Sequence, residues 1–534
     1  MNRVVILGAC LLAALGCGGE GTGTGGSGGT GGTAATGGTS STGGTGGTAA
    51  TGGMPATGGT GGTGGSAGSG GMAGTGGSAG TGGMAGAGGS AGAGGTGGNA
   101  GAGGSGGTTT GPAIECDPIV RVDDYEADTG GPVFLDFASS GNHAAAIWNE
   151  RGGGFEGVTV ARYDFATDEW STPFDVFLET NPGFTPFTDI AIDVDGDVTA
   201  LIREVDAGDQ QLWTRTYDAT GDTWGTSEEA DSDTYGQFNG WALRYDRDSG
   251  EPILAFLTPS MARTSVFFTR RGPTGWTGDV LLEQNNSDSV KDLEFAVNDV
   301  GQALLLYSID VGGTTPTLYV LPYDNGDFRR DGSNALSPFS TTITSLAGVP
   351  AIDLDDTGKG VLLINDSFST ERMLYTVDID IDADTFGAQE LIHDTESPAS
   401  IGAVDVARSE SGVIVAAWGQ KRSIGGQTYP WATAYDGTWI TPREVGTTSL
   451  SGDWQAVIDA SGTATVAWAS GFPGAFATRN TGPGGAFIEP QEITGSVQGG
   501  SGTAAGAAND SGDFLAVWQE NRMVRAARCR NAAP

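Results

Sequence analysis

The sequence predicts an all-β protein: a β-propeller of eight four-stranded blades, closed by an N-terminal strand and preceded by a disordered glycine-rich segment. A phrase made of a polar turn, a glycine and an apolar run that often ends on Trp recurs after residue 130. Its copies lie 50–57 residues apart, which is the spacing of a repeat architecture. The glycines of the turns are Gly141, Gly196, Gly250, Gly301, Gly358, Gly412, Gly462 and Gly512.

Each repeat supplies four short strands. A strand that ends in polar residues, such as Ala191–Asp195, precedes the glycine. An apolar strand such as Ile414–Trp418 follows it, and a continuous apolar run of this length predicts a strand buried on both faces. The third strand often ends in Tyr-Asp, as at Tyr217, and an aromatic residue such as Trp224 then leads into the fourth strand. Four antiparallel strands per unit are typical of a propeller blade.

The last repeat predicts how the ring closes. It has a third strand, Met523–Arg528, but no fourth strand follows it, whereas an unassigned strand lies at Cys116–Val122. We expect this early strand to complete the last blade and remove the open edges of a linear array. Cys529 aligns with the Tyr of Tyr-Asp and Cys116 with the aromatic residue, so we predict a disulfide, which an exported protein can form. Reduction should cost about 4–5 kcal/mol of stability; the alternative is two unpaired buried cysteines.

Residues 1–16 predict a signal peptide. Arg3 precedes the apolar run Val4–Leu15, which is shorter than the roughly 20 residues that a membrane-spanning helix needs. The run ends in Ala14-Leu15-Gly16-Cys17, which resembles the lipobox of bacterial lipoproteins. The resemblance implies cleavage before Cys17, lipidation of its thiol, and an outer-membrane anchor that faces the periplasm or the cell surface. Because the family usually carries Leu where this chain has Ala14, a plain signal peptide is the alternative.

Residues 17–113 predict a disordered tether. They consist largely of Gly, Thr, Ala and Ser, mostly in triplets, but Pro55 is the only proline inside the triplets, so a collagen helix is not expected. The segment has almost no large apolar side chains whose burial would offset the entropy of ordering. A glycine-rich chain of this length has an r.m.s. reach of roughly 50–60 Å. The propeller domain then spans residues 114–534.

The charge of the chain excludes some partners. Only Arg3 and Glu20 carry side-chain charge before Ile114, so the net charge of −39 belongs to the propeller. A negative field of this size opposes binding to nucleic acids, and we expect a monomer without a nucleic-acid partner. The acidic runs Asp193–Asp197 and Asp378–Asp384 have a composition that suits calcium but lack the EF-hand spacing. Structural turns are therefore the preferred interpretation, and no cofactor is expected.

Candidate binding residues lie on the face opposite the glycine turns, among the loops that join second and third strands. Six repeats carry an arginine soon after the second strand, and a ring of guanidinium groups can bind a carboxylate or sulfate through paired hydrogen bonds. The alternative is that each arginine pairs with a nearby acid. The six are Arg151, Arg203, Arg263, Arg372, Arg422 and Arg522. Aromatic residues that are candidates for stacking on sugars are Phe184, Phe187, Tyr235, Phe238 and Trp454.

The phrase and its endings, such as Ala516-Val-Trp-Gln-Glu520, resemble Trp-ended propeller-like repeats of secreted proteins in myxobacteria and other bacteria. The resemblance implies a propeller and export, and it assigns no activity. We therefore predict a membrane-anchored extracytoplasmic binding or scaffold protein whose ligand is a glycan or a protein, without catalytic residues. The alternative is a carbohydrate-active hydrolase or lyase with its site at the propeller channel.

Overall fold

A computed structural model describes most of the chain after residue 113. The described residues are 114–123, 131–152, 155–179, 187–206, 209–231, 238, 240–260, 263–285, 289–311, 315–329, 339–342, 348–368, 371–396, 400–423, 426–470, 475–493, 501–509, 511–520 and 523–531. The predicted signal peptide, Cys17 and the tether lie outside them. In the described part, no helix is long and apolar enough to cross a membrane.

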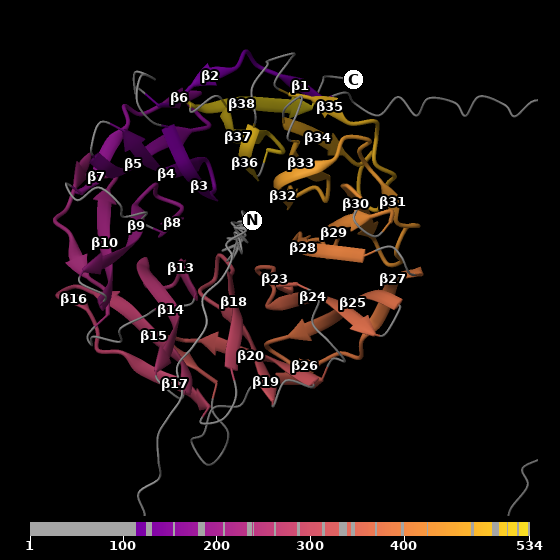
Figure 1. Ribbon diagram of the computed structural model, residues 1–534, viewed down its shortest axis with the longest axis horizontal. Coiled ribbons are helices and arrows are strands. Elements are labelled where there is room, and N and C mark those ends of the chain that lie inside the picture. The colour runs from indigo at the N-terminus through magenta and orange to yellow at the C-terminus, as the bar shows by residue number, and fades with distance from the viewer. Residues whose placement is uncertain are drawn as a thin grey trace, which may run out of the picture. The chain divides into compact units, whose positions relative to one another are not determined.

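The described residues form eight antiparallel sheets arranged as the blades of a ring (Figure 1), which confirms the predicted eight-bladed propeller. Blade 1 holds β3 (Gly131–Ser140), β4 (His143–Gly152), β5 (Phe155–Asp164), β6 (Glu169–Trp170) and β7 (Phe174–Glu179). Blade 2 holds β8 (Phe187–Ile192), β9 (Val198–Asp206), β10 (Asp209–Asp218), β11 (Thr223–Trp224) and β12 (Glu228–Glu229). Blade 3 holds β13 (Gly240–Asp246), β14 (Glu251–Ser260), β15 (Arg263–Gly272), β16 (Gly275–Trp276) and β17 (Val280–Asn285). Blade 4 holds β18 (Ser289–Val297), β19 (Ala303–Val311), β20 (Thr315–Asp324), β21 (Asp327–Phe328) and β22 (Phe339–Thr342).

Blade 5 holds β23 (Ala351–Leu354), β24 (Lys359–Phe368), β25 (Glu371–Asp380), β26 (Thr385–Phe386) and β27 (Glu390–Glu396). Blade 6 holds β28 (Ser400–Arg408), β29 (Ile414–Lys421), β30 (Thr428–Tyr435) and β31 (Arg443–Glu444). Blade 7 holds β32 (Leu450–Ile458), β33 (Ala464–Ser470), β34 (Ala475–Arg479) and β35 (Gln491–Glu492). Blade 8 holds β36 (Ser501–Ala508), β37 (Phe514–Glu520), β38 (Met523–Asn531), β1 (Ile114–Cys116) and β2 (Val120–Arg121). The predicted fourth strand is interrupted in six blades, where two short segments pair with the third strand.

The second strand of each blade is apolar because neighbouring blades cover both of its faces. In β4, Ala144, Ala146 and Trp148 pack in one core cluster, and Ala145 and Ile147 pack in the next. All five side chains are 0% exposed. Alternate residues of a strand point to opposite faces, so burial on both sides removes the usual alternation of apolar and polar residues. The predicted double burial is confirmed.

The turn between the first and second strands has one construction in several blades. In blade 7, Asp459 Oδ1 accepts the backbone N–H of Thr463 at 2.9 Å. Gly462 has φ of +82°, a conformation that side chains with a Cβ rarely adopt. A Cβ there would also approach Val413 Cγ2 of blade 6 to 2.9 Å. The glycine of the repeat phrase is therefore required by the backbone and by the neighbouring blade. We call the face that carries these turns the turn face, and the opposite face the loop face.

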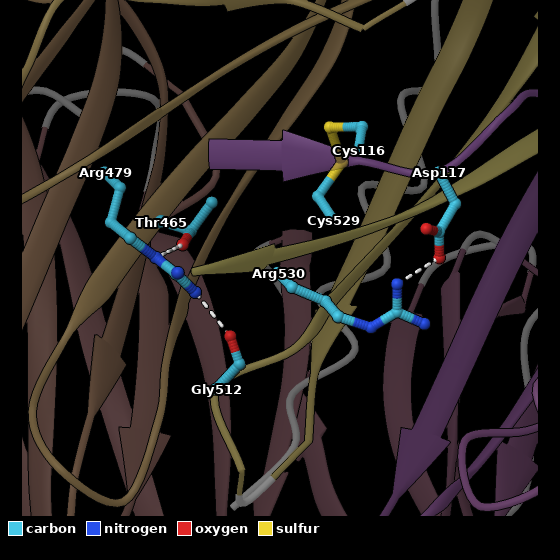
Figure 2. The surroundings of a disulfide bond; sticks show 7 residues. All are labelled: Cys116, Asp117, Thr465, Arg479, Gly512, Cys529 and Arg530. Carbon is cyan, nitrogen blue, oxygen red and sulfur yellow. Dashed lines mark hydrogen bonds and ion pairs between the residues drawn. A yellow bond between two sulfur atoms is a disulfide. The ribbon is translucent and has the colours of Figure 1, made fainter. Parts of the chain in front are cut away.

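The N-terminal strands close the ring as predicted. β1 and β2 pair with β38 as the fourth strand of blade 8. Cys116 lies opposite Cys529, in the register position where Trp170 lies opposite Tyr163 in blade 1, and the two cysteines form a disulfide (Figure 2). The disulfide joins residues separated by 413 positions in the sequence. It therefore replaces covalently the hairpin turn that joins the third and fourth strands in other blades.

Polar contacts tie the closing blade to its neighbours. Arg530 Nη1 of β38 donates to the Asp117 carboxylate, which follows β1 (Figure 2). Arg528 pairs with Asp513 of its own blade and donates from Nη1 to the Phe165 carbonyl of blade 1 at 2.9 Å. These partly buried side chains join the two ends of the ring to each other and to blade 1.

Candidate functional site

The structure does not describe the side chains of three of the six arginines in the predicted ring. Arg522 lies outside the described residues, as do Phe184 and Tyr235. Arg151 and Arg263 belong to β4 and β15, but their side chains are outside the description. The anion-binding ring as a whole stays a prediction.

Three other predicted residues are placed in different surroundings. Arg203 lies over the Trp241 ring, 5.4 Å from its centroid, at the seam between blades 2 and 3. Phe238 is 3% exposed and packs against Phe256, so the expectation that it offers a free face for stacking is wrong. Trp454 lies on β32 and packs over Gly419 of blade 6, although its indole N–H has no acceptor in the described structure. Phe187 opens β8, and its side chain is not described.

Arg372 and Arg422 are brought to the two walls of one seam, between blades 5 and 6. Leu374 of β25 is buried in a core cluster that includes Trp418 of blade 6. Arg372 lies two residues earlier on the same strand and therefore shares its face, towards blade 6. Arg422 directly follows β29 of blade 6. The ring prediction thus places two of its members at one seam near the loop face.

Arg422 forms a platform with Tyr429 and Glu444. Its guanidinium lies over the Tyr429 ring, 3.9 Å from the centroid. It also pairs with both carboxylate oxygens of Glu444, with Nε and Oε2 3.0 Å apart. The Arg422 side chain is 55% exposed and that of Glu444 20% exposed, so the pair lies at the surface. Pairing with a nearby acid was the alternative to an anion-binding ring, although Glu444 lies 22 residues away in the sequence. The pair presents a planar polar edge above the aromatic ring. We call Arg422, Tyr429 and Glu444 the seam platform.

A buried polar cluster of Trp418, Gln420 and His393 lies next to the platform, because Gln420 is two residues before Arg422. Trp418 Nε1 donates to Gln420 Oε1 at 3.0 Å, and His393 Nε2 lies 3.0 Å from the same oxygen. An indole N–H can only donate, so Gln420 presents its oxygen and His393 must carry its proton on Nε2. The His393 ring also packs against Trp418 and Trp431, with centroids 5.1 and 5.4 Å away. The Trp431 N–H is buried without an acceptor in the described structure.

A β-bulge in β27 positions His393. Leu374 of β25 pairs with His393 and Tyr375 pairs with Leu391, so Ile392 is the extra residue. A bulge turns neighbouring side chains towards one face, and here Ile392 packs in the blade 5 and 6 core while His393 contacts Trp418. Blade 1 has the same bulge, with Phe177 in the place of His393. His393 was not among the residues predicted from the sequence. Blade 3 carries Glu283 at the same register position, so the repeat offers no pattern that singles out a histidine there.

We predict that His393 makes stability depend on pH. Burial lowers the pKa of His393. The unfolded chain binds a proton near the ordinary pKa of about 6.5 while the folded chain does not, so stability falls as pH decreases through that window. The slope is at most about 1.4 kcal/mol per pH unit. In urea unfolding between roughly pH 5 and 7, His393→Phe should show a shallower dependence than the native chain. Equal slopes would contradict this prediction.

Carboxylates along the central channel tie the inner strands together. Asp189 of β8 accepts the N–H groups of Ile190 at 2.6 Å and of Leu243 in the next blade at 2.9 Å. Asp405 of β28 likewise accepts those of Val406 at 2.8 Å and Ala456 at 2.6 Å. An inner strand is an edge whose backbone groups would otherwise be unpaired. Burial raises the pKa of Asp189.

A small cavity lies in the same channel. Its volume is about 50 Å³, and Ser139, Arg244, Glu294 and Asp353 are among its lining residues. The cavity has room for a few water molecules. Its lining mixes both signs of charge, and Ser139 Oγ is buried with no partner in the described structure.

The acidic runs considered for calcium form turns and ion pairs. Asp193 Oδ1 accepts the N–H groups of Asp195 at 3.0 Å and Asp197 at 2.8 Å, in the pattern of the blade 7 turn. In the second run, Asp380 pairs with Lys359, and Asp384 accepts Arg329 Nη1 at 2.6 Å. Within the described ranges, no three His, Cys, Asp or Glu side chains are grouped as metal ligands.

Comparisons with known proteins add a likeness of fold. No family model matches the chain, and a search of curated proteins finds no match. Among solved structures, the β-propeller domain of the trilobed protease from Pyrococcus furiosus is 9% identical, with 70% of this chain and 98% of that one covered and a TM-score of 0.40. The polysaccharide lyase Uly1 is 9% identical over 73% and 88% of the two chains, with a TM-score of 0.41. A PL25 ulvan lyase is 11% identical over 76% and 95%, with a TM-score of 0.40.

Proposed function

We propose that this protein is an exported, membrane-anchored binding protein whose propeller holds a glycan at the seam platform. The observation that carries the proposal is the platform itself, in which the guanidinium of an exposed Arg–carboxylate pair lies over one face of an aromatic ring. The C–H faces of a sugar pack on aromatic rings, and its hydroxyl groups can both donate to a carboxylate and accept from a guanidinium. Pockets that combine aromatic walls with a few oriented polar groups are typical of small-ligand sites.

The N-terminal part of the chain supplies the rest of the proposal. Lipidation of Cys17 would anchor the protein in the outer membrane, and residues 17–113 would hold the propeller away from the surface. Replacing Cys17 with Ser should move the protein from the membrane fraction to the soluble fraction of the producing cells. Retention of the variant in the membrane fraction would contradict the lipid anchor.

We predict that a glycan found to bind in a glycan and peptidoglycan screen makes its contacts with the platform residues. Tyr429→Ala and Arg422→Ala should each lower the affinity for the bound glycan at least about tenfold, since each removes an aromatic or charge-assisted contact of about 1.5 kcal/mol. Arg215→Ala is the matched control, because Arg215 lies 4.9 Å over the Phe174 ring at a different seam. Affinity that is equal in all variants would contradict the site.

The same screen distinguishes binding from catalysis. A carbohydrate-active hydrolase or lyase would shorten the bound glycan, and chromatography of the incubated polymer would show products. If the polymer keeps its length after prolonged incubation, the result supports a binding protein. If shorter products appear, the result supports a hydrolase or lyase and contradicts the proposed binding function.

A further inference from the structure

The seam between blades 5 and 6 is also hollowed towards the turn face, and we call its two hollows the groove. Two adjoining hollows of about 360 and 400 Å³ lie between blades 5 and 6, and Tyr435 lines both. The first is also lined by Lys359, Asp380 and Phe386, and the second by Leu391 and Trp439. Glu390–Ile392 of β27 line one side of the second hollow, and residues 437–442, which lead into β31, line the other.

The hollows and the platform use the same two outer segments. Glu390–Ile392 of β27 line the second hollow, and His393 follows them on that strand. Pro442 lines the same hollow, and Glu444 of the platform lies two residues further along. Phe386 lines the first hollow and lies seven positions before His393, roughly 20 Å in extended chain. Together the hollows and the platform therefore span more than one sugar ring, a length that suits an extended chain.

The walls of the groove combine aromatic and apolar side chains with polar and charged ones such as Lys359, Asp380 and Glu390. Tyr435 and Trp439 pack with their ring centroids 5.3 Å apart and are both only partly buried. Leu391 also lines the second hollow and is 49% exposed. In a chain with a net charge of −39, partly exposed aromatic and apolar side chains along one seam favour a ligand with apolar ring faces.

Three cations along the seam are paired with acids. Lys359 pairs with Asp380, and Arg422 with Glu444. Arg408 Nε lies 2.7 Å from Asp355 Oδ2. An anionic polymer would therefore meet paired cations within an acidic protein, and the charge pattern disfavours it. An uncharged polymer meets no such cost.

We propose that the seam between blades 5 and 6 binds an uncharged linear polysaccharide along its length, with the platform at one end and the Tyr435–Trp439 pair at the other. This inference rests on the proposed glycan-binding function. It adds the class of ligand and predicts that several consecutive sugar units are bound.

The test uses the full chain and a length series of neutral oligosaccharides, from a β-glucan, a xylan and a mannan, measured by calorimetry. Alginate and pectate are the anionic probes, and poly-L-proline is the peptide probe. Affinity for one neutral series should rise with chain length until the groove is filled. Trp439→Ala should lower affinity for the long oligosaccharides at least about tenfold and leave the shortest unchanged.

Trp170→Ala is the matched control. Trp170 packs on Tyr163 in blade 1 with ring centroids 5.2 Å apart, as Trp439 packs on Tyr435 in blade 6. Equal effects of the two substitutions, or an affinity that does not depend on chain length, would contradict binding along the groove. Either result would still be compatible with binding at the platform. Preference for alginate, pectate or poly-L-proline would overturn the ligand class. Absence of binding to every carbohydrate would overturn the proposed function itself.

Discussion

Reduction of the Cys116–Cys529 disulfide should lower the free energy of unfolding by about 4–6 kcal/mol. The bond closes a loop across 413 residues, so its loss frees the unfolded chain from a constraint on nearly the whole propeller. In the folded state, β1 would remain attached to β38 only through three register pairs and its flanking contacts. Thermal and urea unfolding of residues 114–534 with and without strong reductant measures the change.

The cysteine content makes this measurement specific. Cys116 and Cys529 are the only cysteines after residue 17, so a reductant acts on this bond alone in residues 114–534. The double variant Cys116→Ser/Cys529→Ser should unfold at the midpoint of the reduced native chain and should not respond to reductant. An unchanged midpoint in both experiments would show that the ring is held without the disulfide.

Replacing Arg479 with Ala should lower the free energy of unfolding by about 3–5 kcal/mol. Arg479 is only 2% exposed, and burial lowers the pKa of its guanidinium. Nε donates to Thr465 Oγ1 at 3.1 Å within blade 7, and Nη2 donates to the Gly512 carbonyl in the turn of blade 8 (Figure 2). Truncation leaves a cavity and removes the donor of a buried carbonyl at the seam next to the closing blade.

Two substitutions separate the role of Arg479 from a general loss of positive charge. Arg479→Lys keeps the charge but cannot reproduce both fixed N–H directions, so it should lose about 1–3 kcal/mol. Arg422→Ala removes a charge at the exposed platform and should leave the unfolding midpoint unchanged. If Arg479→Ala and Arg422→Ala unfold alike, the contacts of Arg479 across the seam contribute nothing to stability.

Arginines at other seams also join neighbouring blades. Arg271 of blade 3 pairs with Glu228 of blade 2 at 2.9 Å, and Arg408 of blade 6 pairs with Asp355 of blade 5 at 2.7 Å. A guanidinium can reach across a seam and hold a carboxylate through two N–H groups. Several of the few cations in this acidic chain therefore hold neighbouring blades together.

The seam site was only partly predictable from the sequence. Arg422 was a candidate because it follows a repeat strand, but Tyr429, Glu444 and His393 carry no local pattern. His393 belongs to the outer strand of blade 5, whereas Gln420 and Glu444 belong to blade 6. Their meeting depends on a bulge and on the packing of two blades, and neither follows from the spacing of the repeat. Phe238 shows the converse, because an aromatic residue in a predicted loop packs in the core.

The sequence by itself determined the architecture of this protein. Eight copies of one phrase specify eight blades, because each copy contains the turn glycine and the doubly buried strand that a blade requires. Alignment of the incomplete last copy also paired Cys116 with Cys529. Only the tertiary structure decided which side chains share a surface, because a seam is built from different blades. The scaffold is local and repeats along the chain, whereas the groove depends on side chains brought together by packing.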